Sequence, residues 1–383
     1  MPEFAQYQVW LCDWNTNKTY QLFPGNDFIS LTWQHLLNDM GVFELTLVAE
    51  TDTKDLFTID YGILIERDYG DGLYEEGYFF HLDEEEWMET DAVDEHYWKS
   101  SGFSPEWMLD QPSLQPLANL NPNYRSYDTW WDYGPADDVI KKMASESMGG
   151  GVVDADREFT TFTVEGNTGE GNWGCYDGRY DRLIDAMRAT IGEDGARGNC
   201  DFRVAHVTGG FELRTYYPYY GTDRRKGNAD GNKPTVFSLE LDNVLNPRRK
   251  VLRYAEATVA IGGWQGAGMH QDTFEEENAT AIAESPYRRR EVCFDVSDVV
   301  QPDTIPGILQ QYLIDYGKAE IVEFKLLQTN ACLYGRDWNL GDLVTLELWG
   351  SEYDMRITEV LGRIDGDNEE VIEGQAKLWT RGI

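Results

Sequence analysis

The chain has 383 residues, 41% of them hydrophobic, so it is long enough for two or three domains and can bury a core. It carries 69 acidic against 32 basic residues, a formal net charge of −37, which disfavours free binding of nucleic acid because that binding rests on Lys and Arg contacts to phosphates. No apolar run is long enough for a membrane span, and the N-terminus lacks the pattern of a signal peptide, so we expect synthesis in the cytoplasm without export.

Residues 1–90 contain short runs of alternating apolar and polar residues, separated by turns rich in Asn, Gly and Pro. Tyr7–Cys12 and Val42–Val48 are two such runs, and Tyr69–Gly72 is a hairpin sequence. Regular short strands with turns of this kind are typical of a barrel or a sandwich. We therefore predict a first small antiparallel β-barrel over residues 1–90.

Residues 91–245 predict an α+β insertion region. Helices are expected over 134–148 and 180–191, where a Pro or acidic first turn precedes an apolar stripe, and strands are expected between and after them. The first part of the region is rich in tryptophan. Exposed Trp side chains could stack on sugars or bases, but Trp in an irregular insertion more often fixes the insertion to its domain or to a neighbouring subunit. We expect this second role for Trp98, Trp107, Trp130 and Trp131.

Two glycine-rich stretches do not match nucleotide-binding motifs. Gly166–Gly174 lacks the Gly-Lys-Ser/Thr ending of a phosphate loop, and Gly262–Gly266 does not reproduce G-x-G-x-x-G and is not followed by a predicted helix. Three short basic runs are each set among acidic residues, so ion pairing within or between subunits is expected for them. These runs are Arg224–Lys226, Arg248–Lys250 and Arg288–Arg290.

The sequence contains no motif that identifies an enzyme, a metal centre or a cofactor site. The five cysteines and five histidines are scattered, and no G-x-S-x-G elbow or H-E-x-x-H helix is present. Asp68–Gly72 and Asp365–Asn368 could seat calcium, but neither has the spaced oxygen ligands of an EF-hand loop, and hairpin turns are favoured. We predict no catalytic, cofactor-binding or metal-binding residues and no enzymatic activity.

The C-terminal stretch contains three further alternating runs, Leu343–Leu348, Met355–Leu361 and Glu370–Ile372. They predict consecutive antiparallel strands, and the Asp365-Gly366 pair is expected to supply the positive φ of a tight hairpin. A helix is also predicted over 306–316, with an apolar stripe and Gly317 at its end.

The run Tyr334-Gly335-Arg336-Asp337-Trp338-Asn339-Leu340-Gly341-Asp342-Leu343-Val344 resembles a motif of a siphophage tail protein family. That family is itself similar to the baseplate hub proteins of contractile tails. The glycine-ended run Ala257–Gly263 and the later Arg-containing run Arg288–Asp295 are similar to a second part of the family pattern. The resemblance covers most of the chain in order.

The resemblance implies a mainly β protein with α+β insertions, built around two small antiparallel β-barrels of the tail-hub type. The implied domains are a first barrel over 1–90, an insertion over 91–245, a second barrel from 246–265 and 318–383, and a loop and helix insertion over 266–317. It further implies a structural baseplate or tail-tip hub of the virion, in which three copies form a ring that continues the tail tube. The implied partners are further copies, a tail tube or distal tail protein, a tape measure protein, and tip, spike or fibre proteins.

The acidic charge suits a channel through which DNA slides without sticking, but general solubility and adaptation to high salt would give the same composition. Two other functions stay open. One is a receptor- or carbohydrate-binding tail module that uses the Trp-rich insertion, with Trp107 and Trp131 as the residues to test. The other is a tail-associated cell-wall hydrolase, which would need two carboxylates at a defined separation.

Overall fold

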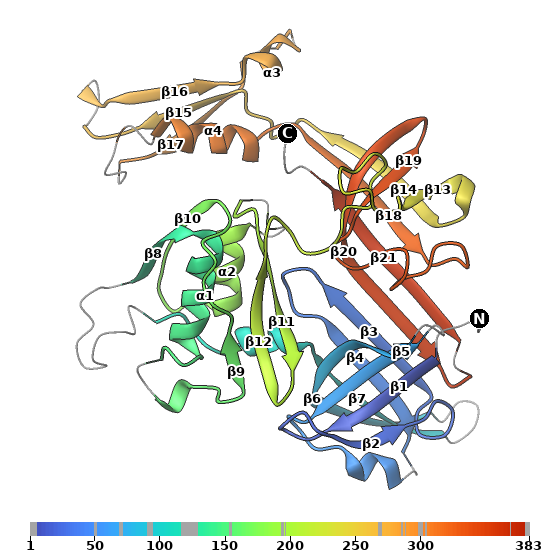
Figure 1. The fold of residues 1–383 in the computed structure, drawn as a ribbon. Coiled ribbons are helices and arrows are strands. Elements are labelled where there is room, and N and C mark those ends of the chain that lie inside the picture. The colour runs from blue at the N-terminus through green and yellow to red at the C-terminus, as the bar shows by residue number, and fades with distance from the viewer. Residues whose placement is uncertain are drawn as a thin grey trace. The chain divides into compact units, whose positions relative to one another are not determined.

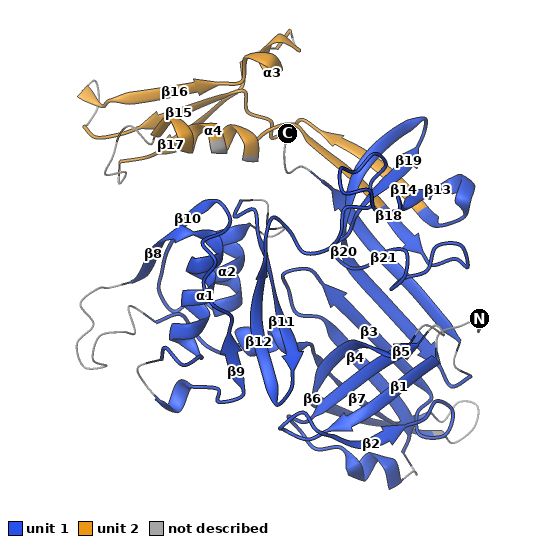
Figure 2. Cartoon of the chain, viewed as in Figure 1, with its two compact units in different colours: residues 1–245, 324–383 blue, residues 246–323 orange. Residues whose placement is uncertain are grey.

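The computed structural model is mainly β, with its α-helices confined to insertions (Figure 1). The chain divides into two compact units, unit 1 with residues 1–245 and 324–383 and unit 2 with residues 246–323 (Figure 2). The structure describes residues 6–49, 52–68, 72–89, 95–115, 129–152, 155–192, 195, 197–266, 270–284, 286–287, 289–297, 302, 305–367 and 369–379.

The N-terminal strands of unit 1 form one half of a 13-stranded sheet, in the order β3-β4-β7-β6-β5-β1-β2. Their side chains alternate between buried and less buried positions, as a strand with one face on a core requires. The strands are β1 (Gln6–Cys12), β2 (Lys18–Leu22), β3 (Ser30–Leu36), β4 (Val42–Val48), β5 (Gly62–Asp68), β6 (Tyr74–Glu89) and β7 (Glu95–Phe103), with the short helix η1 (Asp52–Leu56) before β5.

The C-terminal strands continue the same sheet. The prediction of a mainly β fold with α+β insertions is confirmed, but most of the strands assigned to two small barrels share this one sheet, while β15 (Val259–Gly263) belongs to a separate sheet. No sheet in the described part closes on itself. The reason is β20, which is 15 residues long and pairs with β21 and, through its second half, with β3. These strands are β13 (Val236–Ser238), β14 (Val244–Leu252), β18 (Ala319–Leu327), β19 (Leu343–Leu348), β20 (Ser351–Asp365) and β21 (Glu370–Leu378), with η4 (Leu239–Leu241) after β13.

The turn chemistry of the C-terminal hairpins differs from the prediction. Gly366 does not have a positive φ. The tight turn with two left-handed residues joins β19 to β20 instead, at Trp349 (φ 52°) and Gly350 (φ 76°). Gly366 makes a close backbone approach, because its carbonyl oxygen lies 2.7 Å from where a Cβ of Gly25 would be. Asn368, part of the predicted turn, lies outside the described residues.

The insertion of unit 1 packs two helices against small sheets around one core. The predicted helices are confirmed, but the second begins at Leu183 because Tyr180 has a left-handed φ of 60°, which a helix does not admit. The elements are η2 (Pro105–Leu109), β8 (Trp130–Pro135), α1 (Ala136–Ser147), η3 (Ala155–Arg157), β9 (Phe162–Val164), β10 (Trp173–Gly178), α2 (Leu183–Ile191), β11 (Asp201–Val207) and β12 (Gly210–Tyr216).

Unit 2 is entered along β14 (Val244–Leu252) and left along β18 (Ala319–Leu327). Its sheet has the order β16-β15-β17, and α4 (Ile305–Asp315) covers one face of it through a small apolar core, which confirms the helix predicted over 306–316. The remaining elements are β15 (Val259–Gly263), β16 (Thr273–Glu277), α3 (Ala279–Ala283) and β17 (Glu291–Asp295). No helix within the described ranges is both long and apolar enough to span a membrane. The predicted domain boundaries stay a prediction.

Candidate functional site

The motif of residues 334–344 forms the tightly packed turn that leads into β19. Trp338 is fully buried, and the two glycines of the motif are required by close approaches. Gly335 (φ +84°) faces the Tyr74 hydroxyl, and Gly341 (φ +84°) has the carbonyl oxygen of Tyr220 only 2.4 Å from where a Cβ would be. Any other residue at Gly341 would meet both backbone strain and overlap, so the motif is a structural one.

The two aspartates of the motif fix the loop that precedes β13 (Val236–Ser238). Asp342 accepts hydrogen bonds from the Thr222 backbone N–H (2.7 Å) and from Arg224 Nε (2.9 Å). Asp337 accepts from Lys233 Nζ (2.9 Å) and from Arg336. Burial raises the pKa of Asp342 above its ordinary value despite these donors. At Asp337 the same burial is outweighed by the hydrogen bonds from Arg336 and Lys233, and the pKa is lowered.

A buried ionic cluster joins the N-terminal strands to the C-terminal ones. Arg67 on β5 donates from Nη1 to Glu76 Oε2 (2.7 Å) and lies with Nη2 3.0 Å from Glu370 Oε1. The hydroxyl of Tyr7 donates to Glu370, and that of Tyr334, the first motif residue, donates to Glu76 (2.8 Å). Both carboxylates are excluded from solvent, so they are in no position to act on a glycan or peptide.

A second buried pair fixes the insertion to the sheet. Asp201, which opens β11, pairs with Arg356 of β20 and accepts hydrogen bonds from Asn38 Nδ2 (2.8 Å) and the Tyr220 backbone N–H (2.7 Å). The Asn38 side chain also accepts from the Phe202 backbone N–H (2.9 Å), so the turn after β3 is part of the same network. These charges specify how the segments pack, and they offer no accessible reactive group.

The three basic runs are paired as predicted within the chain. In the first run Arg224 pairs with Asp342, and Lys226 with Glu347 and Glu352. In the other two runs the partners lie on strands or in the turn before β15, and Arg288 lies outside the described residues. The pairs there are Arg249–Glu320, Lys250–Glu323, Arg289–Glu275, Arg289–Glu291 and Arg290–Glu256.

The four tryptophans of the predicted Trp-rich stretch have different environments. Trp130 is buried and Trp107 packs against the core of the insertion, as the predicted fixing role requires, whereas Trp98 is buried on β7 of the N-terminal strands. Trp131 is largely exposed. Tyr133 and Trp173, which the sequence interpretation passed over, are exposed beside it. Reading 130–135 as a strand would have indicated this, because neighbouring residues of a strand point to opposite faces.

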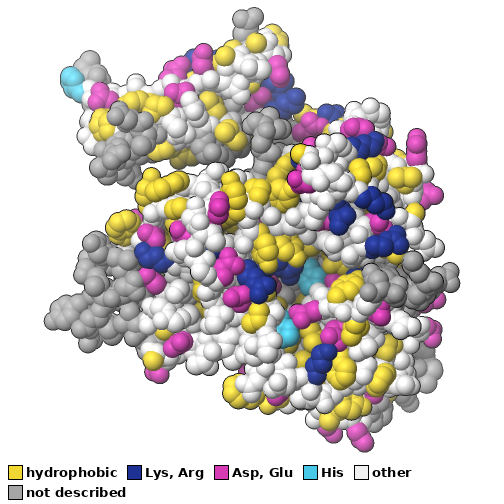
Figure 3. All heavy atoms as spheres, in the orientation of Figure 1, with side chains coloured by type: hydrophobic (Ala, Val, Ile, Leu, Met, Phe, Trp, Pro, Cys, Tyr) yellow, Lys and Arg dark blue, Asp and Glu magenta, His cyan; other side chains and the backbone are white. Residues whose placement is uncertain are grey.

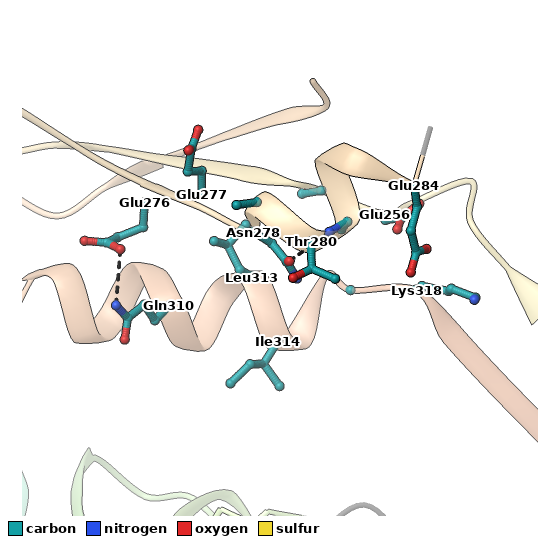
Figure 4. A pocket seen from close by; sticks show the side chains of 14 residues that line it. Glu256, Glu276, Glu277, Asn278, Thr280, Glu284, Gln310, Leu313, Ile314 and Lys318 are labelled. Carbon is teal, nitrogen blue, oxygen red and sulfur yellow. Dashed lines mark hydrogen bonds between the residues drawn. The ribbon is translucent and has the colours of Figure 1, made fainter. Parts of the chain in front are cut away.

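Unit 2 contains a solvent-open groove of about 710 Å³ between β16, α3 and α4 (Figure 4). Its acidic residues are partly neutralised: Arg253 and Arg290 donate to Glu256, and Gln310 Nε2 donates to Glu276 Oε2 (3.1 Å). The hydrogen bonds from Arg253 lower the pKa of Glu256. Among the described residues that line the groove there is no His, Cys or Ser. Within the described ranges, no group of three or more His, Cys, Asp or Glu could hold a metal ion.

Comparison with known proteins places this arrangement in a family. The model of the siphovirus ReqiPepy6 Gp37-like protein family matches residues 14–373. A 43 kDa tail protein of prophage MuSo2 from Shewanella oneidensis superimposes with a TM-score of 0.56 at 13% identity, covering 98% of each chain. A tail protein from Neisseria meningitidis gives 0.54 at 9% identity, covering 97% of this chain and 96% of that one.

In the PdpA–VgrG complex of Francisella, a chain superimposes with a TM-score of 0.52 at 9% identity, over 99% of this chain and 59% of that one. No curated protein matches the sequence. These structural likenesses establish a shared fold, and the family match spans nearly the whole chain. The protein therefore belongs to the siphovirus ReqiPepy6 Gp37-like protein family, a family of siphophage tail proteins.

Proposed function

We propose that the protein is the structural hub of a tail tip or baseplate, in which three copies form a ring that continues the tail tube channel. The observation that carries the proposal is the family match over residues 14–373 together with a fold shared over 98% of each chain with a prophage tail protein. The hub is part of the virion tail and is made in the host cytoplasm.

The buried polar clusters support a scaffold role. Arg67 and Arg356 each sit in a solvent-excluded network that joins segments distant in sequence, as a rigid ring subunit requires. The carboxylates of these networks are shielded from solvent, and the family is one of tail proteins, so we propose that the protein is not an enzyme.

The partners follow from the position of a hub. Further copies lie beside it, a tail tube or distal tail protein and the tape measure protein above, and tip, spike or fibre proteins below. With a net charge of −37, copies around a channel repel phosphates, so DNA passes without specific binding. The PdpA–VgrG complex, one chain of which shares this fold, is a precedent for a further protein docking on such a subunit.

The test is the mass of the purified protein by light scattering, at low and at molar salt. A species of three times 43.9 kDa supports the ring, including one that forms only when salt screens the acidic repulsion. Electron microscopy of that species should show a ring with an open centre. A monomer at both salt concentrations, which stays monomeric after mixing with the tail tube protein, would overturn the proposal.

A further inference from the structure

A two-stranded ribbon in the insertion of unit 1 carries an exposed aromatic face. β8 and β10 pair antiparallel, with Cys175 opposite Tyr133 and Asp177 opposite Trp131. On one face Trp130 is buried in the core and Tyr176 packs against it, because α1 and α2 lie on that side. Every second residue therefore points away from the core, so one ribbon face is left to solvent.

The solvent face consists of three large aromatic side chains with a thiol and a carboxylate among them. Trp131, Tyr133 and Trp173 expose 48%, 63% and 66% of their surface. The rings of Tyr133 and Trp173 lie 4.9 Å apart between centroids. Figure 3 shows hydrophobic side chains at the surface in the area where Figure 1 labels β8 and β10. Exposed aromatic clusters of this kind mark contact sites, since burying them is favourable.

The same face also carries polar groups that are able to form hydrogen bonds with a ligand. Within the described ranges, the Tyr133 hydroxyl, the Trp173 indole N–H and the Asp177 carboxylate make no hydrogen bond or ion pair. A ligand with a flat apolar face and hydroxyls at its edge would satisfy both parts of the surface. The face of a pyranose ring stacks on an aromatic ring, and its hydroxyls donate to a carboxylate and accept from N–H and O–H.

Charge narrows the class of ligand. Bases of single-stranded nucleic acid also stack on aromatic rings, but such binding needs a basic groove for the backbone. Here Asp177 lies on the face itself, and the whole chain has a net charge of −37. Polyanions, whether nucleic acids or uronate polymers, are repelled. A neutral saccharide is not.

We propose that Trp131, Tyr133 and Trp173 form a stacking surface for a neutral pyranose polysaccharide, with Asp177 accepting hydrogen bonds from sugar hydroxyls. Trp131 and Tyr133 are two residues apart on one strand, about 7 Å along the ribbon, so an extended glycan chain can contact both. The site lies within one subunit, so its test does not require the ring.

Cys175 allows the site to be tested in the full chain. It lies on this face opposite Tyr133, while the other exposed thiol, Cys293, belongs to unit 2 and serves as an internal reference. Mass spectrometry measures the alkylation of both thiols by iodoacetamide. The reaction is run with cellohexaose, chitohexaose or maltohexaose added, and polygalacturonate serves as the anionic comparison. At ten times Kd a bound neutral saccharide leaves only about a tenth of the Cys175 sites open, with no change at Cys293.

Variants decide whether the aromatic face is responsible. Tyr133→Ala and Trp173→Ala should each weaken saccharide binding about tenfold or more, because each removes one stacking ring. Trp14→Ala and Trp349→Ala remove tryptophans of similar exposure elsewhere and should leave binding unchanged. The proposal is overturned if no neutral saccharide protects Cys175, or if polygalacturonate protects it equally well. It is also overturned if protection follows protein concentration instead, since the face would then bind protein.

Discussion

The guanidinium of Arg67 lies 3.0 Å from the carboxylate of Glu370, and neither side chain reaches solvent. Arg67 belongs to β5 and Glu370 is the first residue of β21, so this contact links the N-terminal strands to the C-terminal strands. Tyr334 of the family motif donates to Glu76, the other carboxylate on Arg67, so the motif is tied to the same cluster. A buried charge of this kind is sensitive to the loss of any one member.

Arg67→Met should therefore cost about 3–5 kcal/mol of unfolding free energy, because Glu76 and Glu370 would be left buried without their cation. Chemical denaturation measures the change. Lys54→Met is the control, since it breaks an ion pair with Glu86 in which both side chains are substantially exposed, and should cost below about 1 kcal/mol. Equal small losses in both variants would contradict the assigned role of the cluster.

The same cluster predicts a pH dependence. Burial would raise the pKa of Glu76, but Arg67 and then His35 outweigh it and lower the pKa to about 2, from an ordinary value of 4.5. A depressed pKa in the folded state means stabilisation that is fully present above pH 4.5 and is lost as the pH falls toward 2. At neutral pH the unfolding free energy of the wild type should therefore be larger than that of Glu76→Gln by an amount on the order of 3 kcal/mol.

This difference should shrink as the pH is lowered from about 6 to about 3, when unfolding free energies of the two proteins are compared by denaturant titration. Subtracting the variant removes the general effect of protonating other carboxylates in so acidic a chain. A difference that stays constant over this range would show that Glu76 is not held ionised by Arg67.

The sequence predicted those features of the fold that depend only on residues close together in the chain. Strand alternation, and the acidic first turn and apolar stripe of α1, are local, so the N-terminal strands and the helices could be assigned from the residues alone. The pairing of β20 with β3 is not local. An alternating run does not say which distant strand it will pair with, and the run Met355–Leu361 showed only half of the 15-residue strand.

The candidate site illustrates the same limit. Tyr133 and Trp173 meet because β8 and β10 pair across a helix and several loops, and no periodicity in either strand reports this. The predicted positive φ at Gly366 was wrong because Gly is compatible with many turns, and the close approach of the Gly366 carbonyl explains only the glycine at position 25. Local rules give the elements, while contacts between distant segments decide which surfaces remain exposed.

Replacing two glycines of similar φ distinguishes the cost of backbone strain from the cost of steric overlap. Gly350→Ala (φ +76°) places its Cβ in open space and should cost about 1–2 kcal/mol through strain alone. Gly341→Ala (φ +84°) also puts a Cβ 2.4 Å from the Tyr220 carbonyl oxygen and should cost about 1–3 kcal/mol more. Thermal or denaturant unfolding of both variants gives the comparison. Equal costs would mean that the loop carrying Tyr220 moves freely away from the motif.

Trp130 and Trp131 are adjacent in β8 and point to opposite faces. Trp130 is fully buried and its Nε1 donates to Glu146 Oε2 (2.9 Å), so Trp130→Ala should destabilise the protein by about 3–5 kcal/mol through the cavity and the loss of this hydrogen bond. Trp131→Ala removes an exposed ring and should change stability by less than about 1 kcal/mol while it weakens saccharide binding. Unfolding free energies and the Cys175 protection assay, measured on the same two variants, separate folding from binding. If Trp131→Ala destabilised the protein as much as Trp130→Ala, the outer face of the ribbon would be part of the core, and the saccharide surface proposed there would be lost.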